Sequence, residues 1–279
     1  SAWSSIIGSK ASLLDVLELL DQPESFLSVE SDIKPLSFER LIELKEVSFR
    51  YGINQHNTLS SINISLEKGL KIGFIGSTGS GKSTAIDLIM GLLKPTKGEI
   101  VIDGLILKDK HLRRWQKSIA HVPQSVYLSD ATIAENITFS TPADTIDQNL
   151  LNKVAAEAQL LNFIESTPKK YNTNVGESGT FLSGGQVQRI GIARALYKKA
   201  NILILDEATS ALDSVTEKQV MKAISESNKD LTIIIISHRL STIKDCDVIY
   251  EFESGKVISK GTYNELLKSS SSFQKMTKI

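Results

Sequence analysis

Apolar and polar residues follow two different patterns along the chain. From Ile42 to Tyr51 and from Leu59 to Leu66 they alternate in short runs, a pattern typical of antiparallel strands. The runs "LKIGFIG", "NILILDE" and "TIIIISH" contain almost only apolar residues. Such runs are typical of strands buried on both faces of a parallel sheet. The chain is therefore expected to contain both kinds of sheet.

Helical periodicity lies between these predicted strands. Ile86, Ile89, Met90 and Leu93 recur at spacings of three and four after a glycine-rich loop. Residues from about 128 to 200 are expected to be mostly helical, with further helices from about Ser214 and near Thr242. "GEIVIDG" is expected to form another strand, and "VIYEFESGKVISKG" a hairpin. Together these patterns predict an α/β fold with a mainly parallel sheet, an antiparallel β portion at its start and a helical insertion.

The first residues carry a separate amphipathic pattern. In "ASLLDVLELL", residues 11–20, the apolar side chains form one helical stripe: Leu13, Val16, Leu17 and Leu20. The pattern stops at Asp21-Gln22-Pro23, and a polar stretch follows to about Pro35. Two interpretations stay open: a helix packed on its own domain, or the end of a helix that leads in from an absent N-terminal segment.

Composition narrows the class of protein. The 279 residues include 32 Lys and Arg and 32 Asp and Glu. The net charge therefore shows no positive excess that would indicate binding to nucleic acid or to an anionic membrane. Cys246 is the only cysteine, which excludes an intramolecular disulfide and a cysteine-based metal site. The longest apolar runs are far shorter than the roughly 20 residues that span a bilayer. The N-terminus also lacks the pattern of a secretory signal.

"GSTGSGKS", residues 76–83, matches the phosphate-loop pattern G-x-x-x-x-G-K-[ST] between a predicted strand and a predicted helix. Its glycines let backbone N–H groups converge on phosphate oxygens, and the helix N-terminus favours negative charge. Lys82 is expected to reach the β- and γ-phosphates, and the Ser83 hydroxyl to ligate Mg²⁺. The alternative is a chance glycine-serine turn before a helix.

Two acidic residues end a buried strand in "ILILDE". Asp206 is placed to hold a metal ion at the carboxyl end of the strand, where ligands gather in such sheets. Glu207 follows directly, so its carboxylate is a candidate base for the water that attacks the γ-phosphate. The plainer interpretation is that acidic residues after a strand cap the next helix.

A second glycine-rich turn, "LSGGQ", occupies residues 182–186. Ser183 and Gln186 have the spacing of a capping box that opens a helix. Capping does not account for Gly184 and Gly185, because glycines weaken the first turn of a helix. The pair indicates that another group, such as an anion, approaches the backbone closely, and the two interpretations are compatible.

Seven motifs in this order resemble the nucleotide-binding domain of ATP-binding cassette (ABC) proteins over about residues 40–270. They are Tyr51, the phosphate loop, Gln124 in "HVPQS", "LSGGQ", "ILILDE", "SALD" ending at Asp213, and "ISH" ending at His238. The resemblance implies a P-loop NTPase core in residues 39–279, with a helical subdomain at about 125–200. It also implies that residues 1–38 are a helix and linker from an absent membrane domain.

The resemblance implies an ATPase that works as a head-to-tail pair around two ATPs, in which each "LSGGQ" grips the nucleotide of the partner chain. By this resemblance Ser183 and the Gly185 backbone contact the partner's γ-phosphate, and Asp213 lies at the dimer seam and links the two sites. An alternative role for Asp213 is helix capping, because Ser214-Val215-Thr216-Glu217 also has the spacing of a capping box.

The remaining roles are assigned by the same resemblance. The expected catalytic residues are Glu207, His238 and Gln124, with His238 touching the γ-phosphate and Gln124 sensing the metal ion and the water. The expected Mg²⁺ ligands are Ser83, Gln124 and Asp206. The expected ATP contacts are Tyr51, which stacks on adenine, Gly76, Ser77, Thr78, Gly79, Ser80, Gly81, Lys82, Ser83, Thr84, Ser183, Gly184, Gly185, Gln186 and Asp213.

Two stretches resemble the exporter branch of ABC proteins. "NTNVGESG", with Val175-Gly176-Glu177, is similar to the segment that exporters press against their membrane helices, and "SKASLLDVLELLDQPES" to the stretch that joins the last membrane helix to the cassette. The resemblance implies a place on the cytoplasmic face of a membrane, the inner membrane if the source is bacterial. The implied partners are a second copy of the cassette and a transmembrane domain, which is expected to be fused at the N-terminus. No nucleic-acid partner is expected.

The cargo and two alternatives stay open. "IMGLLKPTKGEIVIDG" and "VPQSVYLSD" are similar to cassettes that move lipid-linked sugars or polysaccharide; a lipid or a peptide is also compatible. A soluble ABC-type ATPase of DNA repair or translation would show two cassettes, long coiled-coil insertions or a basic patch, and the sequence shows none of these. A subunit that binds ATP without hydrolysing it would usually lack Glu207 or His238.

Overall fold

A computed structural model describes residues 10, 13, 14, 16, 17, 34–52, 56–139, 141, 145–237 and 239–277. The chain divides into two compact units, Ser1–Lys34 and Pro35–Ile279. In the first unit Leu13, Val16 and Leu17 of the predicted stripe are helical and exposed, while Leu20 lies outside the described residues. Across the described part of the chain, no helix combines the length and the apolar composition needed to span a membrane.

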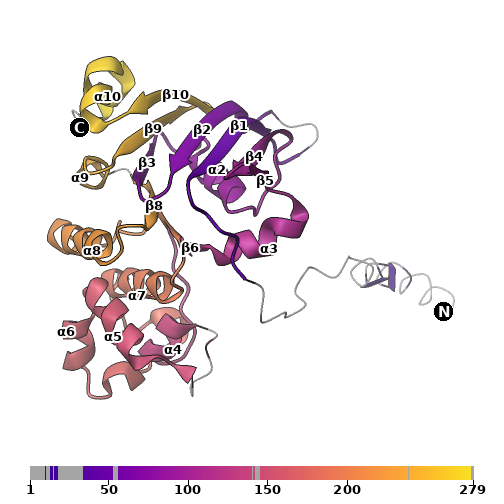
Figure 1. Ribbon diagram of the computed structural model, residues 1–279. Coiled ribbons are helices and arrows are strands. Elements are labelled where there is room, and N and C mark those ends of the chain that lie inside the picture. Colours follow the sequence, from indigo (N-terminus) through magenta and orange to yellow (C-terminus); the bar gives the residue numbers. More distant parts are fainter. Residues whose placement is uncertain are drawn as a thin grey trace, which may run out of the picture. The chain divides into compact units, whose positions relative to one another are not determined.

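The smaller sheet of the second unit is antiparallel, with the order β2-β1-β4-β5 (Figure 1). Its strands are β1 (Leu41–Phe49), β2 (Leu59–Glu67), β4 (Lys97–Ile102) and β5 (Leu105–Ile106). Along β2 buried and exposed residues alternate, so one face of the sheet is buried as the sequence pattern predicts. The ladder between β1 and β4 is irregular near Gly98, where a Cβ atom would lie 2.4 Å from the Lys45 carbonyl oxygen.

The larger sheet has the order β10-β9-β3-β8-β7-β6. Its strands are β3 (Lys71–Ile75), β6 (Ile119–Val122), β7 (Ile202–Asp206), β8 (Thr232–Ile236), β9 (Val248–Glu253) and β10 (Lys256–Gly261). All neighbours are parallel except β9 and β10, which form the predicted hairpin. The predicted fold class is therefore confirmed: a mainly parallel sheet accompanied by a small antiparallel sheet.

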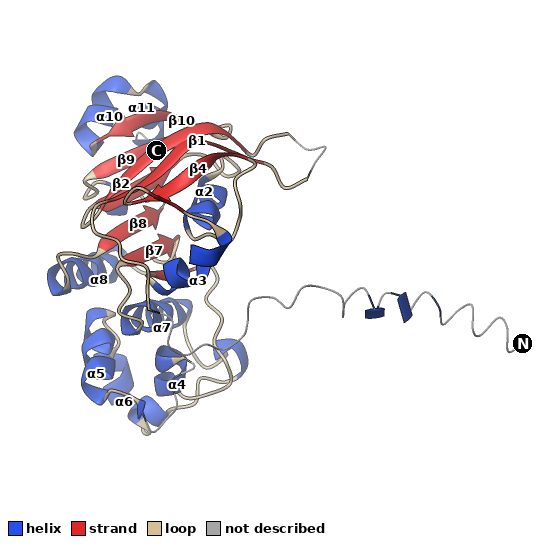
Figure 2. Ribbon diagram, turned by 45° about the vertical axis from the view of Figure 1, so that its right-hand side comes forward, coloured by secondary structure: helices blue, strands red, loops and turns tan. Residues whose placement is uncertain are grey.

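One helix fills the space between the two sheets. Helix α2 (Lys82–Ile89) packs its apolar side chains against both sheets in one core, which also contains Ile42 of β1 and Phe74 of β3. Figure 2 shows α2 between the small sheet and strands β7 and β8. Since α2 follows the phosphate loop directly, its burial fixes the loop to the sheet.

The other helices cover the remaining surfaces. Those of the sheet layer are α3 (Asp109–Lys117), α8 (Ser214–Ser227), α9 (Leu240–Ile243), α10 (Tyr263–Ser269) and α11 (Ser271–Thr277). Within residues 125–200 the helices are α4 (Ile133–Thr138), α5 (Gln148–Glu157), α6 (Leu161–Ser166) and α7 (Gly184–Tyr197), with short 3₁₀ turns at Lys170–Asn172 and Glu177–Gly179. These helices lie together at one end of the unit (Figure 1) and share a second core with the sheet.

Candidate nucleotide-binding site

The phosphate loop connects β3 to α2. At three of its glycines, any other residue would strain the backbone. Gly76, Gly79 and Gly81 have φ angles of 141°, 78° and 105°, a region that side chains beyond glycine rarely adopt. A Cβ atom on Gly76 would lie 2.2 Å from the Phe252 carbonyl oxygen, and one on Gly81 2.6 Å from a Leu59 methyl group. The loop is therefore held tightly against its own fold.

The Lys82 ammonium group lies inside this loop. Its side chain is only 6% exposed, and Nζ donates to the carbonyl oxygens of Gly76 and Ser77 at 2.9 Å each. Burial lowers the pKa of Lys82, and the nearby charges of Glu207 and Asp206 partly offset this shift. A buried cation at the centre of a glycine loop fits the phosphate groups of a nucleotide.

Asp206 and Ser83 meet beside the loop. Ser83, in the first turn of α2, lies close enough to the Asp206 carboxylate at the end of β7 to affect its pKa. Burial raises the pKa of Asp206, and the charges of Glu207 and Asp87 raise it further, against smaller opposing effects of Lys82 and Ser83. A hydroxyl and a carboxylate surrounded by further negative charges are suitable ligands for Mg²⁺. Among the described residues, no three His, Cys, Asp or Glu side chains cluster to hold a metal ion, so phosphate and water oxygens would complete such a site.

The Asp206 charge is expected to destabilise the ligand-free fold. Folding raises its pKa above the usual 3.8, so stability is lost as the pH rises from that value through the folded pKa. Asp206→Asn should raise the free energy of unfolding by roughly 1 kcal/mol at pH 7, and the gain should shrink below about pH 4. Thermal unfolding without nucleotide at both pH values tests this. The exposed Asp230→Asn is the matched control, and a less stable Asp206→Asn at pH 7 would contradict the argument.

Gln124 and Glu207 are brought together from two strands. Gln124 follows β6, and its Nε2 donates to Glu207 Oε2 at 2.7 Å. Glu207 follows β7 with a φ angle of 49°, and its N–H donates to the Ile236 carbonyl of β8 at 2.9 Å. A glutamate in this strained conformation persists only where its surroundings hold it. His238 lies outside the described residues, directly between Ser237 and Arg239.

Tyr51 stands at the edge of the same site. Its ring is 60% exposed and packs edge-on against Phe49 with centroids 4.9 Å apart. The Tyr51 hydroxyl lies 3.2 Å from Thr84 Oγ1 in the first turn of α2. An exposed ring fixed beside the phosphate loop is suited to stack on a base.

The "LSGGQ" turn is a complete capping box at the start of α7. The Gln186 N–H donates to Ser183 Oγ at 3.3 Å, and the Ser183 N–H donates to Gln186 Oε1 at 2.7 Å. The capping interpretation is thus confirmed. A Cβ atom on Gly185 would lie 3.2 Å from the Ala211 carbonyl oxygen, so one close neighbour of the glycine pair belongs to the same chain.

The second turn is separate from the first loop. In the part of the chain that the structure describes, no hydrogen bond or ion pair joins residues 183–186 to residues 76–84. Tyr51, Lys82, Asp206 and Glu207 surround the phosphate loop instead. One chain therefore presents two distinct glycine-rich helix starts.

The capping box predicted at Ser214–Glu217 is wrong. The N-cap of α8 is Asp213, whose Oδ1 accepts the N–H groups of Val215 and Thr216 at 3.0 Å each. Bonds from the Thr216 side chain and backbone lower the pKa of Asp213. Glu217 is turned into the interior, where it contacts other segments. The capping role of Asp213 is thus real, one residue earlier than the spacing indicated.

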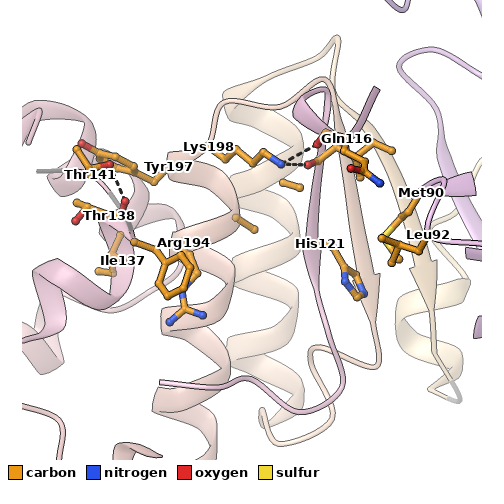
Figure 3. A pocket seen from close by; sticks show the side chains of 14 residues that line it. Met90, Leu92, Gln116, His121, Ile137, Thr138, Thr141, Arg194, Tyr197 and Lys198 are labelled. Atoms are coloured by element: carbon orange, nitrogen blue, oxygen red, sulfur yellow. Dashed lines mark hydrogen bonds between the residues drawn. The ribbon is translucent and has the colours of Figure 1, made fainter. Parts of the chain in front are cut away.

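A groove of about 700 Å³ lies away from the phosphate loop, between the helical portion and strand β6. Figure 3 shows Arg194 and Ile137 on one side, with Met90, Leu92 and His121 on the other. The Arg194 guanidinium lies 4.7 Å from the ring centre of Phe139. The Lys198 side chain extends from α7 toward Gln116, and its Nζ donates to the Gln116 and Ile119 carbonyls.

Residues 59–210 match the family model described as "ABC transporter". The chain belongs to the ABC transporter family and is an ABC transporter ATPase domain. The family resemblance inferred from the seven motifs is therefore confirmed, and with it the ATPase class.

Relatives and a solved structure agree with this assignment. The chain is 39% identical to the ATP-dependent lipid A-core flippase of Photobacterium profundum over 85% of its own length. It is 41% identical to the beta-(1→2)glucan export protein NdvA of Rhodopseudomonas palustris over 91%, and 39% identical to ATP-binding cassette sub-family B member 5 of Mus musculus over 88%. A bacterial Atm1-family ABC exporter with ATP bound superimposes over 99% of this chain, with a TM-score of 0.85 and 30% identity.

These relatives are much longer than this chain. It spans 40% of the flippase, 42% of the glucan exporter and 20% of the mouse protein, and 48% of the solved exporter chain. The region that matches this chain is therefore only one part of each of those proteins.

Three residues near the site carry contacts that the motifs did not indicate. They are Gln188 on α7, Glu217 on α8 and Arg239 after β8, and each binds the segment that follows Glu207. The only feature of the sequence that could have indicated them is their position, because each lies within five residues of a recognised motif.

Proposed function

We propose that this chain binds and hydrolyses ATP as half of a head-to-tail pair that powers export across a membrane. The observation that carries the proposal is the separation of the two glycine-rich helix starts. The phosphate loop has its lysine, metal ligands and base close by, whereas the "LSGGQ" turn has an open helix N-terminus without them. A second copy of the chain supplies the missing counterpart, with each surface used once by each subunit.

Within one chain, the phosphate loop and Lys82 bind the triphosphate while Tyr51 stacks on the adenine. Ser83, Asp206 and Gln124 hold Mg²⁺, which when bound neutralises phosphate charge. Gln124 orients the Glu207 carboxylate, and Glu207 accepts the proton of the attacking water. His238 aligns Glu207 and the γ-phosphate.

The partner chain completes the site. Its Ser183 hydroxyl and Gly185 N–H donate to the γ-phosphate, and the N-terminus of α7 adds a favourable dipole. Asp213 lies at the seam between the chains. Most of the acceleration then comes from positioning and charge stabilisation, and it is available only when two chains close.

The proposal predicts that ATP hydrolysis depends on pairing. At low concentration, the rate per chain should rise with chain concentration, because two chains form each site. Lys82→Ala should lower the rate by about 10²-fold or more, since it removes the buried cation that binds the phosphates. Steady-state hydrolysis over a dilution series measures both effects. A rate per chain that is independent of concentration, in a sample that is monomeric by light scattering, would overturn the proposed pair.

The transport role is supported by the relatives and by the groove beside β6. Export or flipping of lipid A-core and of glucan is named for two relatives, and we propose a lipid-linked sugar or polysaccharide as the cargo class here. The groove, lined by Leu92, Phe139 and Arg194, lies near the segment after Gln124 and would receive a fused transmembrane domain on the cytoplasmic face. The reading frame upstream of Ser1 tests this, since a fused exporter requires several apolar segments of about 20 residues there.

A further inference from the structure

A single segment joins the two halves of the site. The seam segment, residues 208–213, begins directly after Glu207 and ends at Asp213, the N-cap of α8. Gln188 binds it from α7: its Nε2 donates to Ser210 Oγ at 2.9 Å, and its Oε1 accepts the Ala211 N–H at 2.8 Å. The Gln188 side chain is only 6% exposed. The amide thus uses its donor and its acceptor on two consecutive residues, which fixes the seam segment to α7.

Arg239 also binds the seam segment. Its Nη2 donates to the Ser210 carbonyl at 2.6 Å, and its Nη1 to the Leu212 carbonyl at 2.7 Å. The planar guanidinium donates from two separate nitrogens held in a fixed fork, and the single nitrogen of a lysine cannot occupy both positions. Arg239 follows His238 immediately, so the segment that carries the γ-phosphate contact is tied to the seam segment.

Glu217 holds Arg239 and the seam segment together. Its carboxylate is 2% exposed and lies 3.3 Å from Arg239 Nη1. Glu217 Oε1 also accepts the hydroxyls of Thr209 and Thr242 at 2.6 and 2.5 Å. A buried carboxylate is tolerated only with such partners, so these contacts favour one arrangement over others.

We propose that Gln188, Arg239 and Glu217 form a clamp that couples the two ATP sites of the pair. The inference rests on the proposed function. The clamp links the segment around His238 and Glu207, which serve the chain's own ATP, to α7, whose first turn serves the partner's ATP. A shift of either segment is therefore transmitted through residues 208–213 to the other. The three are positioning residues, because none of them touches the nucleotide.

The test uses the full chain and the substitution Gln188→Met, which keeps the side-chain length and removes both hydrogen bonds. ATP affinity of the dilute chain, measured with a fluorescent ATP analogue, should stay unchanged. The kcat for ATP hydrolysis should fall by about 10-fold, within the range of typical coupling energies. The Hill coefficient for ATP should fall from above 1 in the wild type to about 1. Gln188→Glu should restore both values, because a carboxylate accepts from the Ala211 N–H and from the Ser210 hydroxyl.

Two further variants separate coupling from stability. Thr232→Val removes a buried bond, 2.8 Å from Thr232 Oγ1 to the Gly69 N–H, outside the clamp, and should leave the Hill coefficient unchanged despite a lower Tm. Arg239→Lys keeps the positive charge but loses the paired donors to the Ser210 and Leu212 carbonyls. It should show the same lower kcat and Hill coefficient, and it provides the test if Gln188→Met does not fold.

The possible results discriminate between two failures. Folded Gln188→Met and Arg239→Lys chains with wild-type kcat and Hill coefficient would overturn the clamp and leave the proposed function standing. So would a loss of ATP affinity in the dilute chain, because the residues would then act on one site only. A wild-type chain that hydrolyses no ATP, or a Lys82→Ala chain as active as the wild type, would instead overturn the proposed function.

Discussion

Glu207→Gln is expected to lower kcat for ATP hydrolysis by about 10²–10⁴-fold, the usual contribution of a general base, while ATP affinity is retained. The two side chains have the same size, and a glutamine oxygen can still accept the Gln124 N–H that reaches Glu207 at 2.7 Å. The substitution removes the carboxylate that accepts the proton of the attacking water. It also removes a negative charge beside Asp206, and the loss of this charge reduces the repulsion of a bound triphosphate.

Because ATP then stays intact between the two chains and contacts both of them, the Glu207→Gln chains should accumulate as closed pairs. Size-exclusion chromatography with ATP and Mg²⁺ should show a dimer for Glu207→Gln and mostly monomer for the wild type at the same concentration. Glu67→Gln, an exposed substitution on β2, should behave like the wild type. A Glu207→Gln chain that stays monomeric at high concentration, or that turns over at the wild-type rate, would show that Glu207 is not the base.

The sheet layers could be predicted from the sequence because they depend on local patterns. Continuous apolar runs such as Ile233–Ile236 indicate parallel strands buried on both faces, and β8 has this environment. The strand order could not be predicted in this way. Strand β8 lies between β3 and β7 through contacts between segments that are far apart in the sequence, and local periodicity carries no information about such neighbours.

The motifs indicate candidate site residues for the same local reason, and what they leave out also has a physical cause. A phosphate loop is a contiguous turn, so its spacing alone indicates its shape. The bond between Gln124 and Glu207 joins residues 83 positions apart, and only the sheet brings them together. Glu217 shows how a local signal fails: its spacing fits a capping box, but Arg239 and two threonine hydroxyls bind it in the interior.

Two inactive variants are expected to restore activity when they are mixed. Lys82→Ala disables the phosphate loop and leaves the "LSGGQ" turn intact. Gly184→Asp disables the turn, because its carboxylate repels phosphate. It should still fold, since a Cβ atom on Gly184 would meet only the Ala211 Cβ at an ordinary 3.5 Å and an aspartate suits a helix N-terminus. Each variant alone contains no intact pair of surfaces.

In a mixed pair, the phosphate loop of the Gly184→Asp chain faces the intact turn of the Lys82→Ala chain, so one complete site forms. With random pairing half of the pairs are mixed and each has one of two sites, so the mixture should reach roughly a quarter of the wild-type rate. The double variant Lys82→Ala/Gly184→Asp is the control, because mixing it with either single variant creates no complete site. If cross-linking shows mixed pairs but the rate does not exceed the sum of the two variants, the turn does not serve the partner's ATP. Restoration would show that it does, because no site confined to a single chain could recover both functions by mixing.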